Sequence, residues 1–488
     1  MRPFALPLAL AAALLTTACA VGPDYRRPEM KLTPGWQTDL AAQRGRVAAP
    51  VDAWWTGFDD PELVRVVDRA LAQNLDLAQA RARVQASRAA ARAAGAALLP
   101  RLDARGSAAD GRQSLLTPIG RVGSRIPGYD RDYEAYDLGA AASWEIDLFG
   151  GLRREHEAAR AEAAAAEAGA AGARITVAAE AADAYLQIRA FQGRLDVARR
   201  QIAVQQDLVG LIRQRAAQGL AAERELHQTL AALEGAQASL PPLEAGLAAQ
   251  LNRLDVLMGA QPGTWRAELT AGSAMPAPPR LAQGDGPADL LRRRPDVLAA
   301  EQRLVAANAR IGAAISDYYP KVSISALAGF STLGGGRFFS GDAAQNQVAA
   351  GFGWRLFDFG RVDAEVAGAK GREAEALAAY RGTVLHAVED VENAFSSLVQ
   401  EERRADVLER QIADLTAARA QARAAYEGGA LSLIEVLDAD RDLLAASDQL
   451  VQARAGADRA AVTAYRALGG GWTPPATLAA HATGRAAD

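Results

Sequence analysis

Few side chains in this sequence are suited to chemistry, and they stand far apart. The chain has one cysteine, Cys19, and four histidines, His156, His227, His386 and His481. None of the histidines has a second histidine or the cysteine at the spacing of metal ligands, and no nucleophilic-serine motif or phosphate-binding glycine loop occurs. These residues predict no catalytic site, no metal site and no cofactor, so we expect that the protein is not an enzyme.

Cys19 is the residue whose position suggests a covalent modification. Residues 1–18 contain Arg2, then an apolar run, then small residues, which is the layout of a secretory signal peptide. Cys19 follows at once, and the stretch resembles a bacterial lipobox with Thr16 where leucine is usual. The resemblance implies a covalent diacylglycerol and an N-acyl chain on Cys19, and Ala20 after it implies sorting to the outer membrane. An incidental cysteine is the alternative interpretation.

The composition favours packed helices and argues against nucleic acid as a partner. Half of the residues are hydrophobic but only 6% are aromatic, so the apolar content is mostly Ala, Leu and Val. The net charge is −4 and the pI about 5.8, which leaves no basic face for nucleic acid. After the signal peptide no apolar run reaches about 18 residues, so we expect any membrane crossing to use strands.

The chain contains two copies of one unit. Pro320 lies 220 residues after Pro100, and the sequences around the two prolines are similar. Trp354 and Gly429 lie 210 residues after Trp144 and Gly219. The change of offset falls in the first copy's stretch from 106 to 128, which is rich in Gly, Pro and Ser and is a loop by composition. We therefore expect every element of the first copy to recur in the second.

Each copy predicts helix, strand, loop, strand, very long helix, turn and helix. Proline is absent from 129–240 and from 321–473, and residues 152–218 and 361–428 would each span roughly 100 Å at about 1.5 Å per residue. A shorter helix is expected near 61–99, with Asp60 as the N-cap. Another is expected near 222–257, with a bend at Pro241 and Pro242. Leucines every seven residues from Leu226 to Leu254 predict coiled-coil-like packing.

Four stretches alternate between apolar and polar residues, which predicts strands with one apolar face. They are residues 100–109, 138–148, 321–330 and 348–357. Strands of about 9 to 11 residues can cross a bilayer obliquely. Four strands cannot close a barrel, and open edges are not tolerated in lipid, so neighbouring chains must complete it. A soluble four-stranded sheet is the alternative.

Six motifs together carry a family resemblance over nearly the whole mature chain. They are CAVGPDY (19–25), WWTGFDDP (54–61), WEIDLFG (144–150), RPDV (294–297), LFDFGR (356–361) and ALGGGW (467–472). In this order they resemble the TolC/OprM-type outer-membrane efflux factors, in their lipoprotein, NodT-like branch. The resemblance implies an α+β fold: a homotrimer with a 12-stranded β-barrel, four strands from each chain, continuous with a long periplasmic α-helical barrel.

The resemblance also places a gate at the turn after the second long helix. Asp438 matches the acid that narrows the pore in the family, and Ile434 would be the apolar restriction. Glu435 occupies a position that is an acid in some relatives and Thr in others. The resemblance implies that Tyr426 ties the turn through a hydrogen bond. The basic residue that is the tyrosine's partner in some relatives is replaced by Leu431 in this chain. A solvated helix face is the alternative interpretation of the two acids.

The family further implies a function and partners. The chain would be the exit duct of a tripartite efflux pump, passively conducting drugs or other small amphiphiles, with a periplasmic adaptor (membrane fusion) protein and an inner-membrane transporter of the resistance-nodulation-division type, in contact with outer-membrane lipid. Type I protein secretion, metal efflux and a non-conducting structural surface lipoprotein are the alternatives.

These interpretations divide the chain as follows: signal peptide 1–18, lipidated extended segment 19–60, first repeat 61–259, linker 260–285, second repeat 286–469 and tail 470–488.

Overall fold

The computed structural model describes residues 20–38, 40, 50–270, 274–281 and 286–473. The chain forms two compact units, each assembled from segments that are distant in sequence. The first comprises residues 1–28, 85–165 and 301–379, and the second comprises residues 29–84, 166–300 and 380–488. The predicted signal peptide and Cys19 lie outside the described residues.

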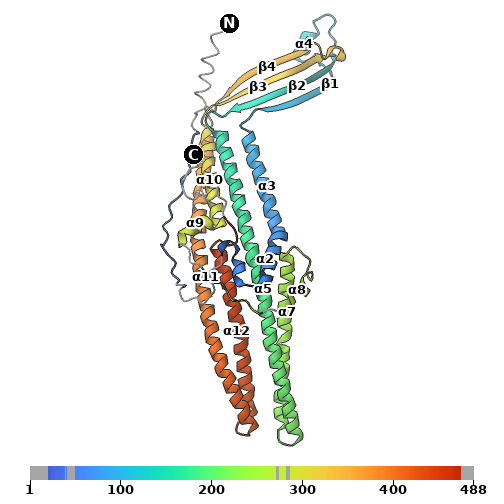
Figure 1. The fold of residues 1–488 in the computed structure, drawn as a ribbon. Helices are drawn as coiled ribbons and strands as arrows, with labels where there is room; N and C mark the ends of the chain where they lie inside the picture. The colour runs from blue at the N-terminus through green and yellow to red at the C-terminus, as the bar shows by residue number, and fades with distance from the viewer. Residues whose placement is uncertain (1–19, 39, 41–49, 271–273, 282–285, 474–488) are drawn as a thin grey trace. The chain divides into compact units, whose positions relative to one another are not determined.

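The helices recur at the offsets that the sequence predicts. Helices α5 (Gly151–Ala217) and α11 (Arg361–Glu427) both have 67 residues and begin 210 residues apart (Figure 1). Helices α3 (Leu75–Ala96) and α10 (Pro295–Ser316) both have 22 residues and begin 220 apart. The predicted internal repeat and the two very long helices are therefore confirmed.

The helix predicted near 61–99 is in fact two helices, α2 (Pro61–Gln73) and α3, separated by Asn74. Asn74 is extended, with ψ at 132°. Its Oδ1 accepts hydrogen bonds from the backbone N–H groups of Asp76 and Leu77, at 2.9 and 3.1 Å, and its Nδ2 donates to the carbonyl of Leu257. Asn74 thus caps α3 and ties the break to a neighbouring helix, which explains why the continuous helix was a wrong prediction.

The start of α2 is as predicted. The Asp60 carboxylate accepts hydrogen bonds from the backbone N–H groups of Glu62 and Leu63, as an N-cap should. Its second oxygen accepts from the Tyr185 hydroxyl at 2.6 Å, and Glu62 pairs with the fully buried Arg189 of α5. The cap therefore also fastens α2 to α5.

The last helix of each copy differs at the prolines. The first copy has α6 (Glu223–Ala238) and α7 (Leu240–Leu257), interrupted at Ser239 just before Pro241 and Pro242. The second copy has one helix, α12 (Leu433–Ala467), which begins and ends 210 residues after α6 begins and α7 ends. The effect of the prolines appears as this one-residue interruption, because a proline has no N–H to donate within a helix, whereas the predicted bend stays a prediction.

The four strands form one antiparallel sheet in the order β1-β2-β3-β4. They are β1 (Arg101–Arg112), β2 (Asp132–Ile146), β3 (Lys321–Leu333) and β4 (Ala344–Gly353). The predicted strands exist, but β1 and β3 run three residues further, while β2 and β4 begin earlier and end before Leu148 and Trp354. Pairing with the neighbouring strand, which alternation alone does not reveal, decides these ends.

The sheet register places even-numbered residues of all four strands on one face. Directly opposed pairs include Leu102 with Ala142, Trp144 with Ile324, and Val322 with Phe352. On the other face Ser107 donates a hydrogen bond to the opposed Asp137 at 3.1 Å. The alternation therefore becomes one apolar face and one polar face across the sheet.

Short elements fill segments that were expected to be irregular. A 3-10 helix, η2 (Val51–Phe58), lies in the segment predicted to be extended, where Trp54 stacks on Tyr465 at 5.6 Å between ring centroids. The segment from 106 to 128, expected to be a loop, contains the end of β1 and then α4 (Pro118–Gly123). The remaining short elements are α8 (Arg266–Thr270), η3 (Pro287–Asp289), α9 (Leu290–Arg293) and η4 (Gly335–Arg337).

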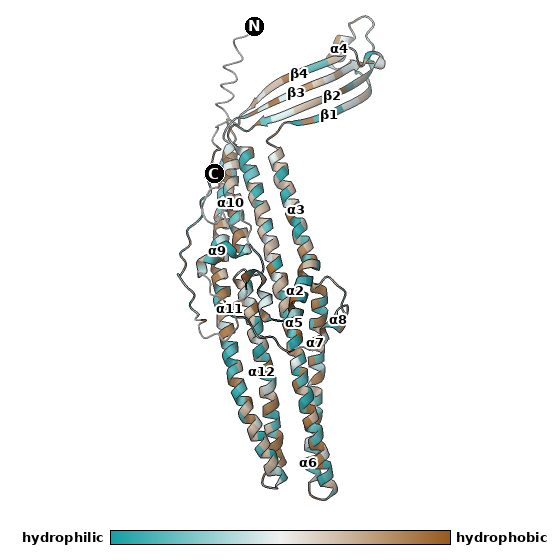
Figure 2. Ribbon diagram, viewed as in Figure 1, coloured by the Kyte–Doolittle hydropathy of each residue, from teal (hydrophilic) through white to brown (hydrophobic). Residues whose placement is uncertain are grey.

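Small residues form much of the helical core, as the composition predicts. In the first unit Ala158 and Ala161 of α5 pack on Ala306 and Ala309 of α10. In the second unit the heptad residues Leu240 and Leu247 border a cluster that includes Leu195 of α5. Among the described residues, no helix is both long enough and apolar enough to cross a membrane, and Figure 2 shows polar and apolar residues mixed along the helices.

One buried carboxyl group has no hydrogen-bond partner in the part of the chain that the structure describes. Asp458 of α12 is 1% exposed, and neither of its oxygens has a hydrogen-bond partner among the described residues. It borders a cavity of the second unit whose other charged lining residues are Glu402, Arg403, Asp406, Glu409 and Arg454. Burial raises the pKa of the Asp458 carboxyl well above its usual value.

We expect Asp458→Asn to stabilise the protein increasingly as the pH rises. Because the folded-state pKa of Asp458 is raised, its proton favours the folded state at low pH, and this contribution is lost as the pH passes the folded pKa. The melting temperature of the variant, followed by circular dichroism, should approach that of the parent only below the unfolded-state carboxyl pKa of about 3.9, and the excess of the variant over the parent should grow as the pH rises above that value. The exposed Asp438→Asn serves as control, and a difference independent of pH would contradict the assignment.

Candidate functional site

The turn between α11 and α12 is built by a glycine in the left-handed conformation. Gly429 has φ of 75°, its N–H donates to the Tyr426 carbonyl at 3.0 Å, and the Ala430 N–H donates to the Ala425 carbonyl at 2.8 Å. This pair of bonds is a Schellman motif, which satisfies carbonyls at the end of α11. The chain is thereby reversed over five residues, and Leu433 begins α12.

The first copy makes the same turn. Gly219 has φ of 72°, its N–H donates to the Ala216 carbonyl, and the Leu220 N–H donates to the Arg215 carbonyl at 2.8 Å. The two turns are therefore equivalent in backbone, and what distinguishes them is their side chains.

Tyr426 lies in the core of this region. Its ring packs with Leu208 and Ile212 of α5 and with Leu433 and Val436 of α12. The Arg215 guanidinium lies over the ring, at 5.0 Å from its centroid. Burial raises the pKa of the Tyr426 hydroxyl, and nearby Glu225 adds to the effect.

The predicted role of Tyr426 as a hydrogen-bonding latch stays a prediction. Within the described residues its hydroxyl makes no hydrogen bond that ties the turn, and its ring joins α5 to the α11–α12 hairpin instead. The apolar neighbours come from α5, more than two hundred residues away in sequence, so the tyrosine's burial could not be read locally.

The other three predicted gate residues share one exposed face at the start of α12. Ile434 is 53% exposed, and Glu435 and Asp438 are exposed as well. Residues 434 and 438 are four apart and therefore lie on the same side of the helix. An isoleucine and two carboxylates are thus presented together, directly after the turn.

Two arginines that were not predicted from the sequence pair with acids of α12 near this face. Arg441 pairs with Asp438 at 3.3 Å and also with Asp442. Arg419 of α11 donates to the buried Asp440 at 2.5 Å, and Gln205 of α5 approaches the second oxygen of Asp440 at 3.4 Å. Three-residue helical spacing could have revealed Arg441, whereas the contacts of Asp440 require the tertiary structure.

Burial raises the pKa of the Asp440 carboxyl, and Arg419 opposes that effect. Asp440 therefore holds the hairpin to α5, and Asp438 faces outward with one partly compensating arginine. The face carries negative charge, although less than two unpaired acids would.

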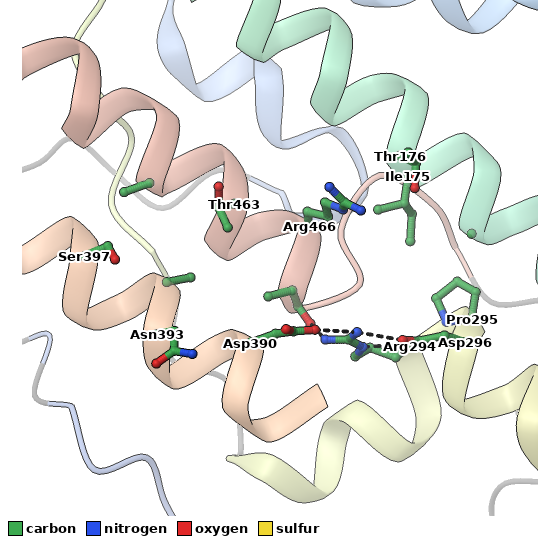
Figure 3. Close-up of a pocket in the computed structure, with 14 residues that line it drawn as sticks. Ile175, Thr176, Arg294, Pro295, Asp296, Asp390, Asn393, Ser397, Thr463 and Arg466 are labelled. Carbon is green, nitrogen blue, oxygen red and sulfur yellow. Dashed lines mark hydrogen bonds and ion pairs between the residues drawn. The ribbon is translucent and has the colours of Figure 1, made fainter. Parts of the chain in front are cut away.

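The motif RPDV forms a clamp in the second unit. The Arg294 guanidinium bridges Asp296 of α10 and Asp390 of α11, with distances of 2.6 and 2.9 Å (Figure 3). It also donates to the Ala467 carbonyl at the end of α12. Arg294 thus joins three helices beside a cavity that Asn393, Ser397 and Thr463 also line.

The segment after Cys19 is bound to the first unit. The Val21 N–H donates to the Phe149 carbonyl at 3.0 Å, and Asp24 pairs with Arg154 of α5 at 2.7 Å. Arg27 pairs with Glu301 of α10. Cys19 itself lies outside the described residues, but the residues that follow it are held beside the unit that carries the sheet.

No group of three histidine, cysteine, aspartate or glutamate side chains in the described part of the chain is arranged to hold a metal ion. His156 lies beside Gly95, whereas His227 and His386 lie within 4 Å of Glu223 and Glu389 on their own helices. His481 lies outside the described residues.

Comparison with known proteins identifies the family. The family model described as outer membrane efflux protein matches the chain twice, over residues 66–260 and 286–470. The chain is 32% identical over 447 residues to the pyoverdine export outer membrane protein OpmQ of Pseudomonas putida, covering 91% of this chain and 93% of that protein. It is 30% identical to the toluene efflux pump outer membrane protein TtgF of Pseudomonas putida, covering 97% of this chain and 98% of that protein.

The fold agrees with a solved channel of the same kind. The structure of the outer-membrane channel OprN matches with a TM-score of 0.83 at 35% identity, covering 93% of this chain and all of that chain. The predicted fold class and location in the outer membrane are confirmed. The chain therefore belongs to the outer membrane efflux protein family, and it is an outer-membrane channel that serves as the exit duct of an efflux pump.

Proposed function

We propose that three copies of this chain close one channel, which passively conducts small amphiphilic compounds from the periplasm to the exterior. The observation that carries the proposal is the sheet, which has one apolar face and two outer strands that are each paired on one side only within the described chain. Unpaired strand edges are not tolerated in hydrocarbon, so other copies must pair with them. Three chains would give twelve strands, an even number typical of outer-membrane barrels.

The proposed narrow end is the exposed start of α12, with Ile434 as apolar restriction and Glu435 and Asp438 as charged residues. The exposure of all three supports this placement, because buried side chains could not line a pore. Rings of carboxylates favour cations and repel anions. Since Arg441 pairs with Asp438, the selectivity would be moderate, and Glu435 would contribute the less compensated charge.

The substrate class follows from the breadth of the family rather than from a binding pocket. Relatives at 30 to 32% identity over nearly the full chain are named for pyoverdine export and for toluene efflux, two chemically unlike compounds. A duct of this kind would leave selection to its partners, an inner-membrane transporter of the resistance-nodulation-division type and a periplasmic adaptor. The chain itself would carry out no reaction.

Lipidation of Cys19 would hold the N-terminus in the membrane. The described residues after it are bound to the sheet-bearing unit through Val21 and Asp24. Each buried methylene of an acyl chain contributes about 0.8 kcal/mol, and several chains give stable anchoring.

Replacing Asp438 should open the proposed restriction. We expect Asp438→Ala to raise the leak conductance of the purified protein in planar bilayers and to sensitise cells to large antibiotics, because a charged ring and its arginine pairing are lost. Glu223→Ala, an exposed acid at the start of α6, is the matched control and should leave conductance unchanged. Equal conductance of both variants and parent, with normal assembly, would count against the gate.

Ion selectivity tests the charge of the same face separately from its size. The double variant Glu435→Gln and Asp438→Asn keeps the side-chain volumes but removes two carboxylates from each chain. Its reversal potential in a potassium chloride gradient should shift toward that of a nonselective pore. If no current is seen in the parent or in any variant, a non-conducting structural lipoprotein becomes the better proposal.

Metabolic labelling tests the lipid anchor. Cells given radioactive palmitate should yield a labelled parent protein and an unlabelled Cys19→Ala variant, which should still reach the outer membrane through its strands. An unlabelled parent would show that Cys19 is not acylated.

A further inference from the structure

The loop between β1 and β2, residues 113–131, lies at the end of the sheet away from the helices. Strand β1 begins soon after α3 ends, and β2 leads back into α5, so the loop joins the far ends of this hairpin within the first unit (Figure 1). In an outer-membrane channel whose helices lie in the periplasm, the far end of the sheet faces the exterior. The loop therefore stands beside the outer leaflet of the membrane.

The loop is an ordered structure whose inside is made of backbone and glycine. Its base is closed by the Gln113 N–H, which donates to the Arg131 carbonyl at 2.7 Å. Helix α4 is capped by the Thr117 hydroxyl, which accepts a hydrogen bond from the Gly120 N–H at 3.2 Å. Gly120 and Gly123 are buried, and a Cβ atom on Gly120 would lie 1.9 Å from a backbone oxygen. No large side chain fits inside this loop.

The large aliphatic side chains of the loop lie on its outside instead. A group of exposed aliphatic side chains on an ordered segment indicates a contact surface, whereas single ones need no explanation. Five such side chains occur within twelve residues of this loop, with exposed fractions between 36% and 82%. They are Leu115, Leu116, Ile119, Val122 and Ile126.

The same loop is basic, although the chain as a whole has a net charge of −4. The charged residues of the segment 113–129 are Arg121 and Arg125 alone. Both arginines are exposed, and within the described residues neither guanidinium has a hydrogen bond or an ion pair. Two uncompensated positive charges therefore accompany the exposed aliphatic side chains.

The equivalent loop of the second copy, residues 334–343, lacks this combination. Its arginine, Arg337, pairs with Asp342 at 3.3 Å. Its Phe338 ring packs against Phe330 of β3, at 6.2 Å between centroids. The second loop thus neutralises its charge and covers part of its apolar surface within the chain. The surface of the first loop is therefore not a general consequence of connecting two strands.

We propose that residues 115–126 bind the phosphate-bearing lipid of the outer leaflet, with the aliphatic side chains in hydrocarbon and Arg121 and Arg125 on lipid phosphates. A guanidinium binds phosphate through two parallel N–H bonds, so the charge and the geometry are complementary. Aliphatic side chains beside basic ones are typical of segments that lie in a membrane interface. The same loop of a neighbouring copy fits this surface less well, because arginine would then meet arginine.

A fluorescent label at position 119 tests the lipid contact. The full-length Ile119→Cys variant, labelled with an environment-sensitive maleimide dye, would be placed in nanodiscs of phosphatidylcholine alone or with increasing fractions of lipid A. Lipid A should shift the emission of the dye to shorter wavelength and reduce its quenching by acrylamide in the aqueous phase. The parent protein, treated in the same way, reports any labelling of Cys19.

Substitution of the two arginines separates phosphate recognition from apolar insertion. From the contribution of one basic residue near an anionic membrane surface, Arg121→Gln and Arg125→Gln should each raise the lipid A fraction that gives half of the emission shift about fivefold. The double variant Arg121→Lys and Arg125→Lys keeps the charge and should retain most of the response, which a loop that had lost its fold would not. Arg337→Gln is the matched control from the second loop and should leave the response unchanged.

Three results would overturn the proposal. Equal quenching of the dye with and without lipid A would show that the loop does not enter the leaflet. Protection of the dye in both kinds of nanodisc, unchanged by the arginine substitutions, would show that the loops of neighbouring copies cover one another. A full response to lipid A in the double glutamine variant would show that the arginines do not bind phosphate.

Conductance of the parent is a separate measurement, since the emission shift requires only the folded protein in a lipid disc. If the parent does not conduct but the dye responds to lipid A as expected, the lipid-binding surface stands and the conducting function fails. If the parent conducts and the dye does not respond, the channel stands and the lipid-binding surface fails.

Discussion

The pairing of backbone groups at the edges of the sheet is the constraint on which the rest of this structure depends. The sheet has one largely apolar face, formed by even-numbered residues of all four strands. Its outer strands are each paired on one side within the described chain. In hydrocarbon an unpaired N–H or C=O group costs several kcal/mol, so such a sheet is stable there only as part of a closed ring. A chain that contributes four strands must therefore share its edges with others.

Duplication of one unit explains how a single sequence can build such a ring. The two hairpins have the same register, and the two long helices have the same length. The repeats differ in side chains at the ends of their helical hairpins. Where the second copy has Ile434 and Asp438, the first has Arg224 and Gln228. Equivalent backbones thus present different chemistry, so that only one of the two turns carries an isoleucine and two acids together.

Polar contacts between helices supply specificity that a core rich in alanine lacks. Alanine contacts are small and alike along a helix, so they do not define one register between neighbours. Buried polar pairs do, because a misplaced charge would lose its partner. Arg189 with Glu62 fixes α2 on α5, Arg419 with Asp440 fixes the last hairpin, and Arg294 joins three helices. Asp458 is different, since it is buried, has no hydrogen-bond partner among the described residues and costs stability when ionised.

The sequence by itself determined the elements and their duplication. Long stretches without proline, glycines at the turns and strict alternation in the strands are local signals, so the long helices and all four strands could be predicted from them. The break at Asn74, the burial of Tyr426 and the ends of the strands were decided by the tertiary structure. Asn74 caps α3 and is held at the break by its bond to Leu257, Tyr426 packs on Leu208 and Ile212, and each strand extends as far as its partner does. These features depend on contacts with residues that are far away in the sequence. A local sequence pattern carries no information about such contacts.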